Sequence, residues 1–163
     1  MKASSRTTTS ARARRAPPAR PTSCEVVVAD ARRARRLLLT RTPRGKLHVE
    51  ERARLDEHWD EKQHHRPYML SAHGRSMASA GHERDERLQR FGRDLAAWLE
   101  RAPATDGRLP VLLPAPMLGA LRRAARASLL RGLQLRVRDL GWLNLTELAA
   151  HRELGALLPP AED

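Results

Sequence analysis

The sequence predicts an α/β domain built on a mixed five-stranded sheet, in the order β-β-β-α-β-α-β-α. Three strand-like segments follow one another closely in the first half, and strands alternate with helices in the second. Consecutive strands with short connections favour an antiparallel meander, whereas each later crossover must be right-handed, so that its helix covers one face of the sheet. Of the 163 residues, 40% are hydrophobic but only 3% are aromatic, which predicts one domain with a core of Leu, Val and Ala.

The first three strands are predicted from aliphatic runs. Residues 24–30 (CEVVVAD) form a buried strand that ends at an Asp, and residues 35–41 (RRLLLTR) form the second strand. A Pro-Arg-Gly turn leads into residues 46–55 (KLHVEERARL), where two aliphatic residues share a face with an acid. Because this alternation is partial, we expect the third segment to be an edge strand.

The main helix is expected over residues 83–101, with its first turn beginning around residues 79–82. Its apolar positions recur at helical spacing, acids lie early in it, and a proline follows it. The positions that define this face are Leu88, Phe91, Leu95, Trp98 and Leu99.

Two further strand and helix pairs complete the predicted domain. Residues 109–113 (LPVLL) form a short buried strand, and Pro116 opens a second helix. Residues 134–138 (QLRVR) form the fifth strand, and an Asn-x-x-Glu capping pattern at 144–147 starts a last helix through about Leu154. The apolar face expected for the second helix comprises Leu118, Leu121, Ala125 and Leu129.

The net charge of +12 is concentrated at the N-terminal end. Residues 1–46 carry 13 Lys and Arg against two acids, whereas residues 47–163 carry 18 against 17. Residues 1–22 hold six basic residues and no acid, and almost nothing in them could anchor a core. We therefore predict a disordered basic tail over 1–22, one α/β domain over 23–155, and a flexible C-terminal tail over 156–163.

The expected location is the cytoplasm. No apolar run approaches the roughly 20 residues that span a bilayer, and residues 1–22 lack the apolar region of a secretory signal. Their acid-free, Arg- and Ser-rich composition also resembles an organellar transit peptide. The single cysteine, Cys24, excludes an internal disulfide, and its strand position predicts a small buried hydrophobe rather than a nucleophile.

Four segments together resemble the bacterial host attachment protein family. The resemblance covers residues from about 24 to 154, and its motifs come in the family's order. The matching segments are residues 26–39 (VVVADARRARRLLL), 82–91 (HERDERLQRF), 112–122 (LLPAPMLGALR) and 139–143 (DLGWL).

This resemblance implies a fold of the ribonuclease-H-like or translational-machinery type, similar to the middle domain of archaeal and eukaryotic release factors. In those factors a Gly-Gly-Gln loop positions water for hydrolysis of peptidyl-tRNA. The comparable connection here, residues 56–82, holds Gln63, Gly74 and Gly81 far apart. Hydrolysis by that route is therefore not expected, and fold alone does not transfer function. The positions in this connection that we single out as a candidate loop site are His73, Gly74, Arg75 and His82.

The residues offer two candidate metal sites, a zinc site and a two-metal nuclease centre, and neither is predicted. The histidines at 58, 64, 65, 73 and 82 are irregularly spaced, which favours a solvated polar loop over a zinc site. Asp30 and Asp139, with acids from residues 56–61, could assemble a two-metal nuclease centre. The favoured interpretation is that Asp30 caps one turn and Asp139 starts another. No metal or cofactor is expected.

Arginines provide the positive case for a function. Guanidinium groups bind phosphate in bidentate fashion, and RNA recognised by its shape requires a basic patch. The alternative is that the arginines of residues 31–36 pair with Glu50, Glu51 or Asp56. The predicted nucleic-acid-binding residues are Arg12, Arg14, Arg15, Arg32, Arg33, Arg35 and Arg36.

The leading hypothesis is a non-catalytic binding domain that associates with rRNA, tRNA or the ribosome. A hydrolase acting on peptidyl-tRNA or nucleic acid through residues 56–82 is the first alternative. A protein linked to adhesion on a host surface is the second, and it follows from the family's name alone.

Overall fold

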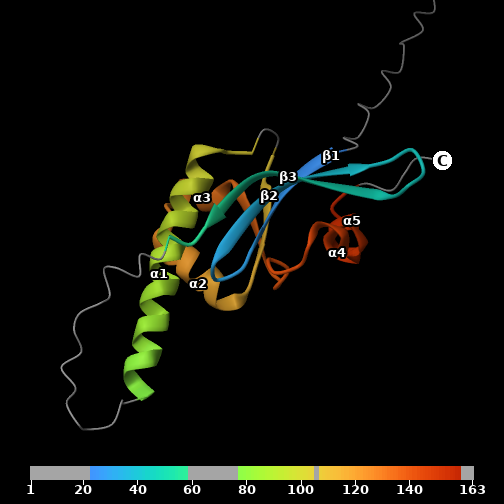
Figure 1. Ribbon diagram of the computed structural model, residues 1–163. Coiled ribbons are helices and arrows are strands. Elements are labelled where there is room, and N and C mark those ends of the chain that lie inside the picture. Colours follow the sequence, from blue (N-terminus) through green and yellow to red (C-terminus); the bar gives the residue numbers. More distant parts are fainter. Residues whose placement is uncertain (1–22, 59–76, 105–106, 159–163) are drawn as a thin grey trace, which may run out of the picture.

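A five-stranded sheet with helices on both faces forms the domain (Figure 1). The computed structural model describes residues 23–58, 77–104 and 107–158, and side chains are described in α1 only from residue 81. The predicted tail of residues 1–22 lies outside these ranges. The strands are β1 (Ser23–Ala29), β2 (Arg33–Arg41), β3 (Leu47–Asp56), β4 (Leu109–Leu113) and β5 (Leu133–Val137). The helices are α1 (Met77–Arg101), α2 (Ala115–Ala124), α3 (Ala127–Arg131), α4 (Leu145–Ala150) and α5 (Arg152–Gly155).

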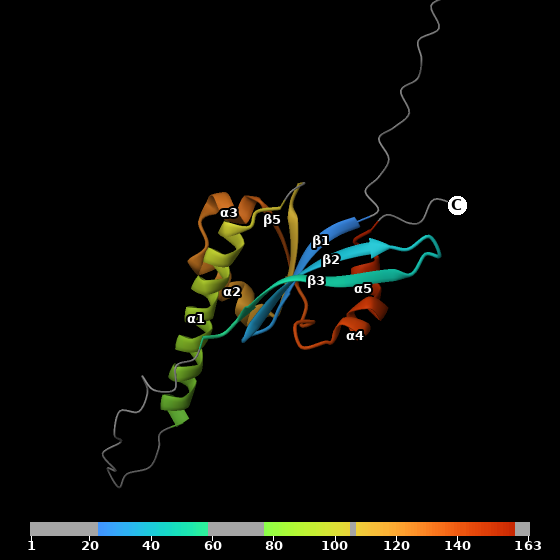
Figure 2. The same cartoon turned by 45° about the horizontal axis from the view of Figure 1, so that its top comes forward.

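The sheet is mixed, as predicted, with the strand order β3-β2-β1-β4-β5. Strands β1, β2 and β3 form the antiparallel meander, and β1, β4 and β5 are parallel. Figure 2 shows β1, β2 and β3 running side by side, with α4 and α5 on one side of the sheet and α1 to α3 on the other. The carboxyl ends of the three parallel strands therefore lie at one edge of the domain.

The helices differ from the predicted order because two of the expected helices are each divided in two. Ala125 and Arg126 have extended backbone, with ψ of 142° and 153°, and separate α2 from α3. His151, with ψ of 120°, separates α4 from α5. The predicted Asn144 capping box is confirmed: its side chain accepts from the backbone N–H of Glu147, whose carboxylate accepts from the N–H of Asn144.

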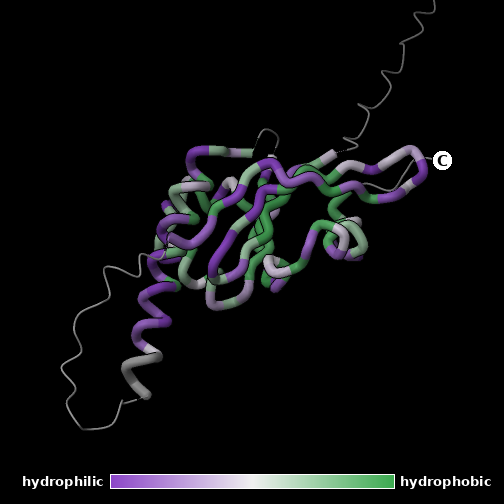
Figure 3. The backbone as a smooth tube through the Cα atoms, in the orientation of Figure 1, coloured by the Kyte–Doolittle hydropathy of each residue, from purple (hydrophilic) through white to green (hydrophobic). Residues whose placement is uncertain are grey.

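Two hydrophobic clusters lie on opposite faces of the sheet. Strand β1 alternates between them, because Val27 and Ala29 pack under α1 and α2 while Val26 and Val28 pack under α4. Figure 3 shows green hydrophobic segments within the sheet and purple hydrophilic ones along the outer turns of α1. The predicted face of α1 is confirmed at its centre, since Phe91 is 1% exposed.

A bulge shifts the register of β3 against β2. Arg36 pairs with Ala53 and Leu37 pairs with Glu51, so Arg52 has no partner in the register. One extra residue in a strand turns every following side chain to the other face. The first half of β3 consequently packs against the α4 side and its second half against the α1 side.

The C-terminal boundary of the packed domain lies beyond residue 155. Leu158 is only 4% exposed and belongs to the cluster on the α4 side. The chain therefore stays on the domain through residue 158, and residues 159–163 of the predicted tail lie outside the described part of the structure.

Helices α1 and α2 approach most closely at Gly92. A Cβ atom at this position would lie 2.9 Å from the Cβ of Ala120 and 3.0 Å from its carbonyl carbon. Backbone cannot yield as a flexible side chain can, so the glycine sets the distance between these two helices.

We expect Gly92→Ala to destabilise the domain by about 1–3 kcal/mol, because overpacking outweighs the gain in helix propensity. Urea unfolding followed by circular dichroism measures this change. Gly81→Ala in the same helix is the control, since nothing lies within 4 Å of the added methyl group; it should be neutral or stabilising by up to about 1 kcal/mol. Equal effects of the two substitutions would contradict the close approach.

Candidate functional site

The turn between β1 and β2 is organised by Asp30. Its Oδ1 accepts hydrogen bonds from the backbone N–H groups of Arg32 (2.7 Å) and Arg33 (2.9 Å), and its Oδ2 pairs with Arg33 Nε at 3.1 Å. The predicted turn-capping role of Asp30 is thus confirmed. Arg32 is exposed, so of the four arginines predicted in this segment it is the one freely presented to solvent.

Arg35 is buried instead of exposed. Its side chain is 5% exposed, and its Nη2 donates to the carbonyls of Gly141, at 2.8 Å, and Leu143. Burial is the main cause that lowers the pKa of its guanidinium group, and the nearby charge of Arg33 adds to it. The Nε atom is buried with no hydrogen-bond partner among the described residues. Arg35 therefore fastens the segment after β5 to the sheet.

Arg36 points to the other face. It is 7% exposed, pairs through Nη2 with Glu25 at 2.6 Å, and donates to the carbonyls of Ala102 and Pro103 at the end of α1. The prediction that Arg35 and Arg36 contact nucleic acid is corrected: strand alternation buries both, and internal acceptors occupy them. The expected pairing of these arginines with Glu50, Glu51 or Asp56 was also wrong. Arg33 pairs with Asp30, and Arg36 pairs with Glu25.

A cleft of ≈ 1220 Å³ opens at the carboxyl ends of β1, β4 and β5. Its walls come from the β1–β2 turn, the N-terminal half of α1, the start of α2 and the segment after β5. This edge of a parallel sheet is where α/β proteins commonly bind ligands. The cleft is lined by Asp30, Ala31, Arg32, Glu57, Gly81, Glu83, Arg84, Asp85, Arg87, Leu88, Pro114, Pro116, Met117, Asp139 and Trp142.

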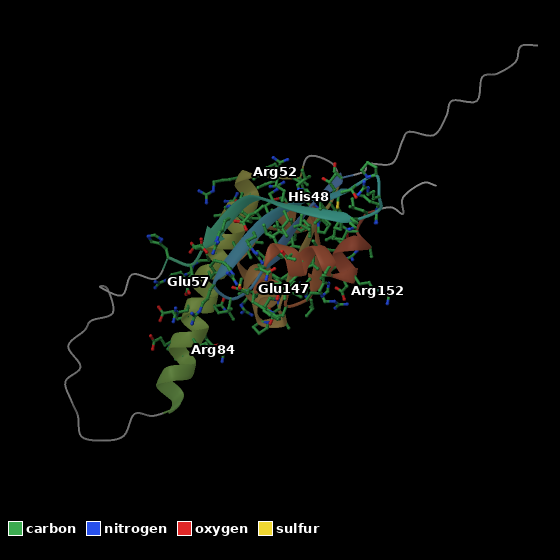
Figure 4. The ribbon with its side chains drawn as sticks, turned by 45° about the vertical axis from the view of Figure 1, so that its right-hand side comes forward. His48, Arg52, Glu57, Arg84, Glu147 and Arg152 are labelled. Carbon is green, nitrogen blue, oxygen red and sulfur yellow. The ribbon has the colours of Figure 1, made fainter. Side chains whose placement is uncertain are left out.

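Two interactions fix the walls of this cleft. Glu57, just after β3, accepts from Arg87 of α1 at 3.1 and 3.2 Å, which ties the meander to the helix. The indole Nε1 of Trp142 donates to the carbonyl of Asp139 at 3.0 Å, although the side chain is 61% exposed. Figure 4 shows Glu57 and Arg84 on the same flank of the molecule, beside α1. The cleft thus combines a positioned, exposed indole with charged groups.

The predicted loop site is only partly within the described residues. His73, Gly74 and Arg75 lie outside them, and His82 is exposed on α1. Asp30 and Asp139 do line the same cleft, as the nuclease hypothesis required. The Asp30 carboxylate is occupied by its turn, however, and no group of three or more His, Cys, Asp or Glu side chains within the described ranges could hold a metal ion.

A second set of arginines lies on α2, α3 and the start of β4. Residues 107–138 hold seven arginines and no acid. All seven side chains are exposed, and five of them come from α2, α3 and the residues beside them; Arg108 Nε donates to the carbonyl of Arg131 at 3.0 Å. The charges of residues 47–163 nearly balance, so a count over that whole range does not reveal this segment. A count over a shorter window would reveal it. We call Arg108, Arg122, Arg123, Arg126 and Arg131 the arginine surface.

Cys24 lies half-buried in β1, beside the cluster on the α4 side. Burial raises the pKa of its thiol, so the thiol stays protonated at neutral pH. A nucleophilic cysteine needs the opposite shift. The raised pKa agrees with the prediction that Cys24 is not a nucleophile, although the side chain is half-buried and not fully buried as predicted.

The sheet order and the helices on both faces place the chain among three-layer α/β/α domains. It belongs to the family described as "Protein required for attachment to host cells", whose model matches residues 25–151. The match confirms the resemblance found in the sequence, over nearly the same residues. No curated protein matches the chain significantly. None of the helices in the described ranges is long and apolar enough to cross a membrane.

We expect Arg35→Ala to lower the free energy of unfolding by about 2–4 kcal/mol, because the carbonyl groups of Gly141 and Leu143 lose their donor. Urea denaturation measures this loss. Arg52→Ala on the outer strand β3 (Figure 4) is the matched control, since Arg52 is exposed and should change stability by less than about 0.5 kcal/mol. A loss for Arg35→Ala no larger than that of the control would show that the contacts stabilise nothing.

We expect Cys24 to react slowly with iodoacetamide in the folded protein. Because its pKa is raised, the thiolate fraction at a given pH is smaller than in an unstructured peptide, and the rate should reach its plateau at higher pH. Mass spectrometry across a pH series, with the urea-unfolded chain as reference, measures this. A folded-state rate that exceeds the unfolded rate at pH 7 would contradict it.

Proposed function

We propose that this member of the host attachment family binds RNA through its arginine surface. The observation that carries the proposal is the charge of residues 107–138, seven arginines without a carboxylate. No described carboxylate pairs with Arg122, Arg126 or Arg131, so their guanidinium groups are available to an external anion. A phosphate backbone fits such a surface.

The arrangement favours recognition of shape over recognition of base sequence. No aromatic residue occurs in residues 107–138, and single-stranded RNA is usually held by stacking bases on aromatic rings. Arginines on a helical layer are suited to phosphates of a folded RNA such as rRNA or tRNA. Arg32 on the exposed turn, and Arg12, Arg14 and Arg15 in the N-terminal segment, add further phosphate contacts. Such a ligand would place the protein in the cytoplasm.

The sheet order supports a fold of the ribonuclease-H-like type, similar to the middle domain of release factors. An antiparallel meander followed by two parallel crossovers is the arrangement expected for that type. Scaffold alone does not establish activity, so the proposal rests on the arginines. The hydrolase alternative gains no support from Asp30, whose carboxylate is bound within its own turn. Adhesion to a host surface is supported by the family's description alone.

We expect Arg122→Ala/Arg126→Ala/Arg131→Ala to weaken binding to unfractionated tRNA or rRNA fragments by more than about tenfold at low salt. Each lost phosphate contact removes about 0.7 to 0.9 from the slope of log affinity against log salt, so the slope should fall by about 2 to 3. Fluorescence titrations over a salt series with the full chain measure both quantities.

The control variant Arg44→Ala/Arg52→Ala/Arg54→Ala removes the same charge from the β2–β3 side of the domain. It should leave the slope unchanged within about 1. An equal loss of binding in both triple variants would show that net charge, and not the arginine surface, causes the binding. The absence of salt-dependent binding in the parent protein would refute RNA binding.

A further inference from the structure

The large apolar side chains that the described residues expose gather in one stretch, residues 137–145. They are Val137 (45% exposed), Trp142 (61%) and Leu145 (38%). Trp142 also lines the cleft at the carboxyl ends of the parallel strands. Exposed tryptophans beside a cleft are typical of the centre of a protein-binding surface, because one rigid ring buries a large area.

The cleft is anionic although the chain carries a net charge of +12. Five carboxylates and three guanidinium groups line it, and Glu57 and Arg87 neutralise each other. The Asp30 carboxylate pairs with Arg33. The other charged groups in the lining are the carboxylates of Glu83, Asp85 and Asp139 and the guanidinium groups of Arg32 and Arg84. With three carboxylates against two guanidinium groups, the cleft suits a cationic ligand that also has apolar surface.

A segment of this chain has that chemistry. Residues 14–21, which lie outside the described part of the structure, have the sequence RRAPPARP. Arg15, Pro18 and Pro21 are spaced as Arg-x-x-Pro-x-x-Pro. Proline-rich segments of this spacing favour the polyproline II conformation and dock against aromatic side chains, and a flanking arginine pairs with acids.

We propose that the cleft binds the Arg15–Pro21 segment of a second copy of this chain. The prolines pack on the indole of Trp142, whose ring orientation is set by its hydrogen bond to the Asp139 carbonyl. Arg15 pairs with the carboxylates contributed by α1, Glu83 and Asp85. Binding of this kind depends on Trp142, Glu83 and Asp85, which lie outside the arginine surface, and it shares only Arg15 with the RNA-binding proposal.

The segment must come from a second copy, because the chain between it and β1 is too short to reach the cleft of its own domain. The cleft lies at the end of β1 that is remote from Ser23, and seven residues of strand separate the two by roughly 20 Å. Pro21 is two residues from Ser23 and can move at most about 7 Å from it. Pro18 can move at most about 18 Å away. Neither proline can therefore enter the cleft of its own domain.

The test is a fluorescence anisotropy titration of a fluorescein-labelled peptide of residues 11–22 with the full chain. We expect saturable binding that Trp142→Ala weakens by about tenfold or more and Trp142→Phe largely retains. Asp85→Asn should weaken it several-fold, whereas Asp94→Asn, an exposed acid of α1 outside the cleft, should not. Sedimentation velocity should show an apparent mass that rises with concentration in the parent and not in Trp142→Ala.

Four results would overturn the proposal. One is the absence of peptide binding up to about 1 mM protein. Another is equal binding of a scrambled peptide with the same residues, which would leave charge alone as the cause. The third is association of the full chain that survives both Trp142→Ala and Pro18→Ala/Pro21→Ala. Tighter binding of an unrelated proline-rich peptide, with no self-association, would assign the cleft to a different protein.

Discussion

Two adjacent arginines on β2 hold the layers of this domain together. Successive side chains of a strand point to opposite faces, so Arg35 reaches the segment after β5 while Arg36 reaches the end of α1. Arg41, on the same face as Arg35, donates to the carbonyl of Gly155 at 3.0 Å and holds α5. Backbone carbonyls are their main acceptors, so these bonds fix the position of main chain. These contacts also shape the cleft. Arg35 holds Gly141 so close to the β1–β2 turn that a Cβ atom added to Gly141 would lie only 2.4 Å from the backbone nitrogen of Asp30.

The strands and the main helix were predictable because their signals are local. Aliphatic runs and helical spacing are enough to find β1, β4 and α1. The breaks within two helices were not predictable, since residues 124–127 are Ala-Ala-Arg-Ala and contain no glycine or proline. Tertiary packing overrides propensity there. The bulge at Arg52 left no break in the alternation of β3, because its position depends on the register with β2.

The candidate site was less accessible to sequence reasoning. A cluster of four arginines was visible, but which of them face solvent follows from strand alternation and from acceptors about 70 to 110 residues away. Composition alone treats buried and exposed arginines alike. Trp142 could have been noticed as one of three tryptophans in a chain with few aromatics. Its exposure beside the cleft depends on the crossover of β5, which no local pattern shows.

The contact between Arg35 and Gly141 also constrains how the protein is made. The two residues are 106 positions apart in the chain, and Arg36 and its acceptor Ala102 are 66 positions apart. At a synthesis rate of about 5–20 residues per second, Arg35 is synthesised roughly 5 to 20 s before the carbonyls that satisfy it. Until then neither α4 nor α5 exists to cover the face of β1 and β2 that holds Val26, Val28 and Leu37. An aliphatic face that stays uncovered for this time favours aggregation of the nascent chain.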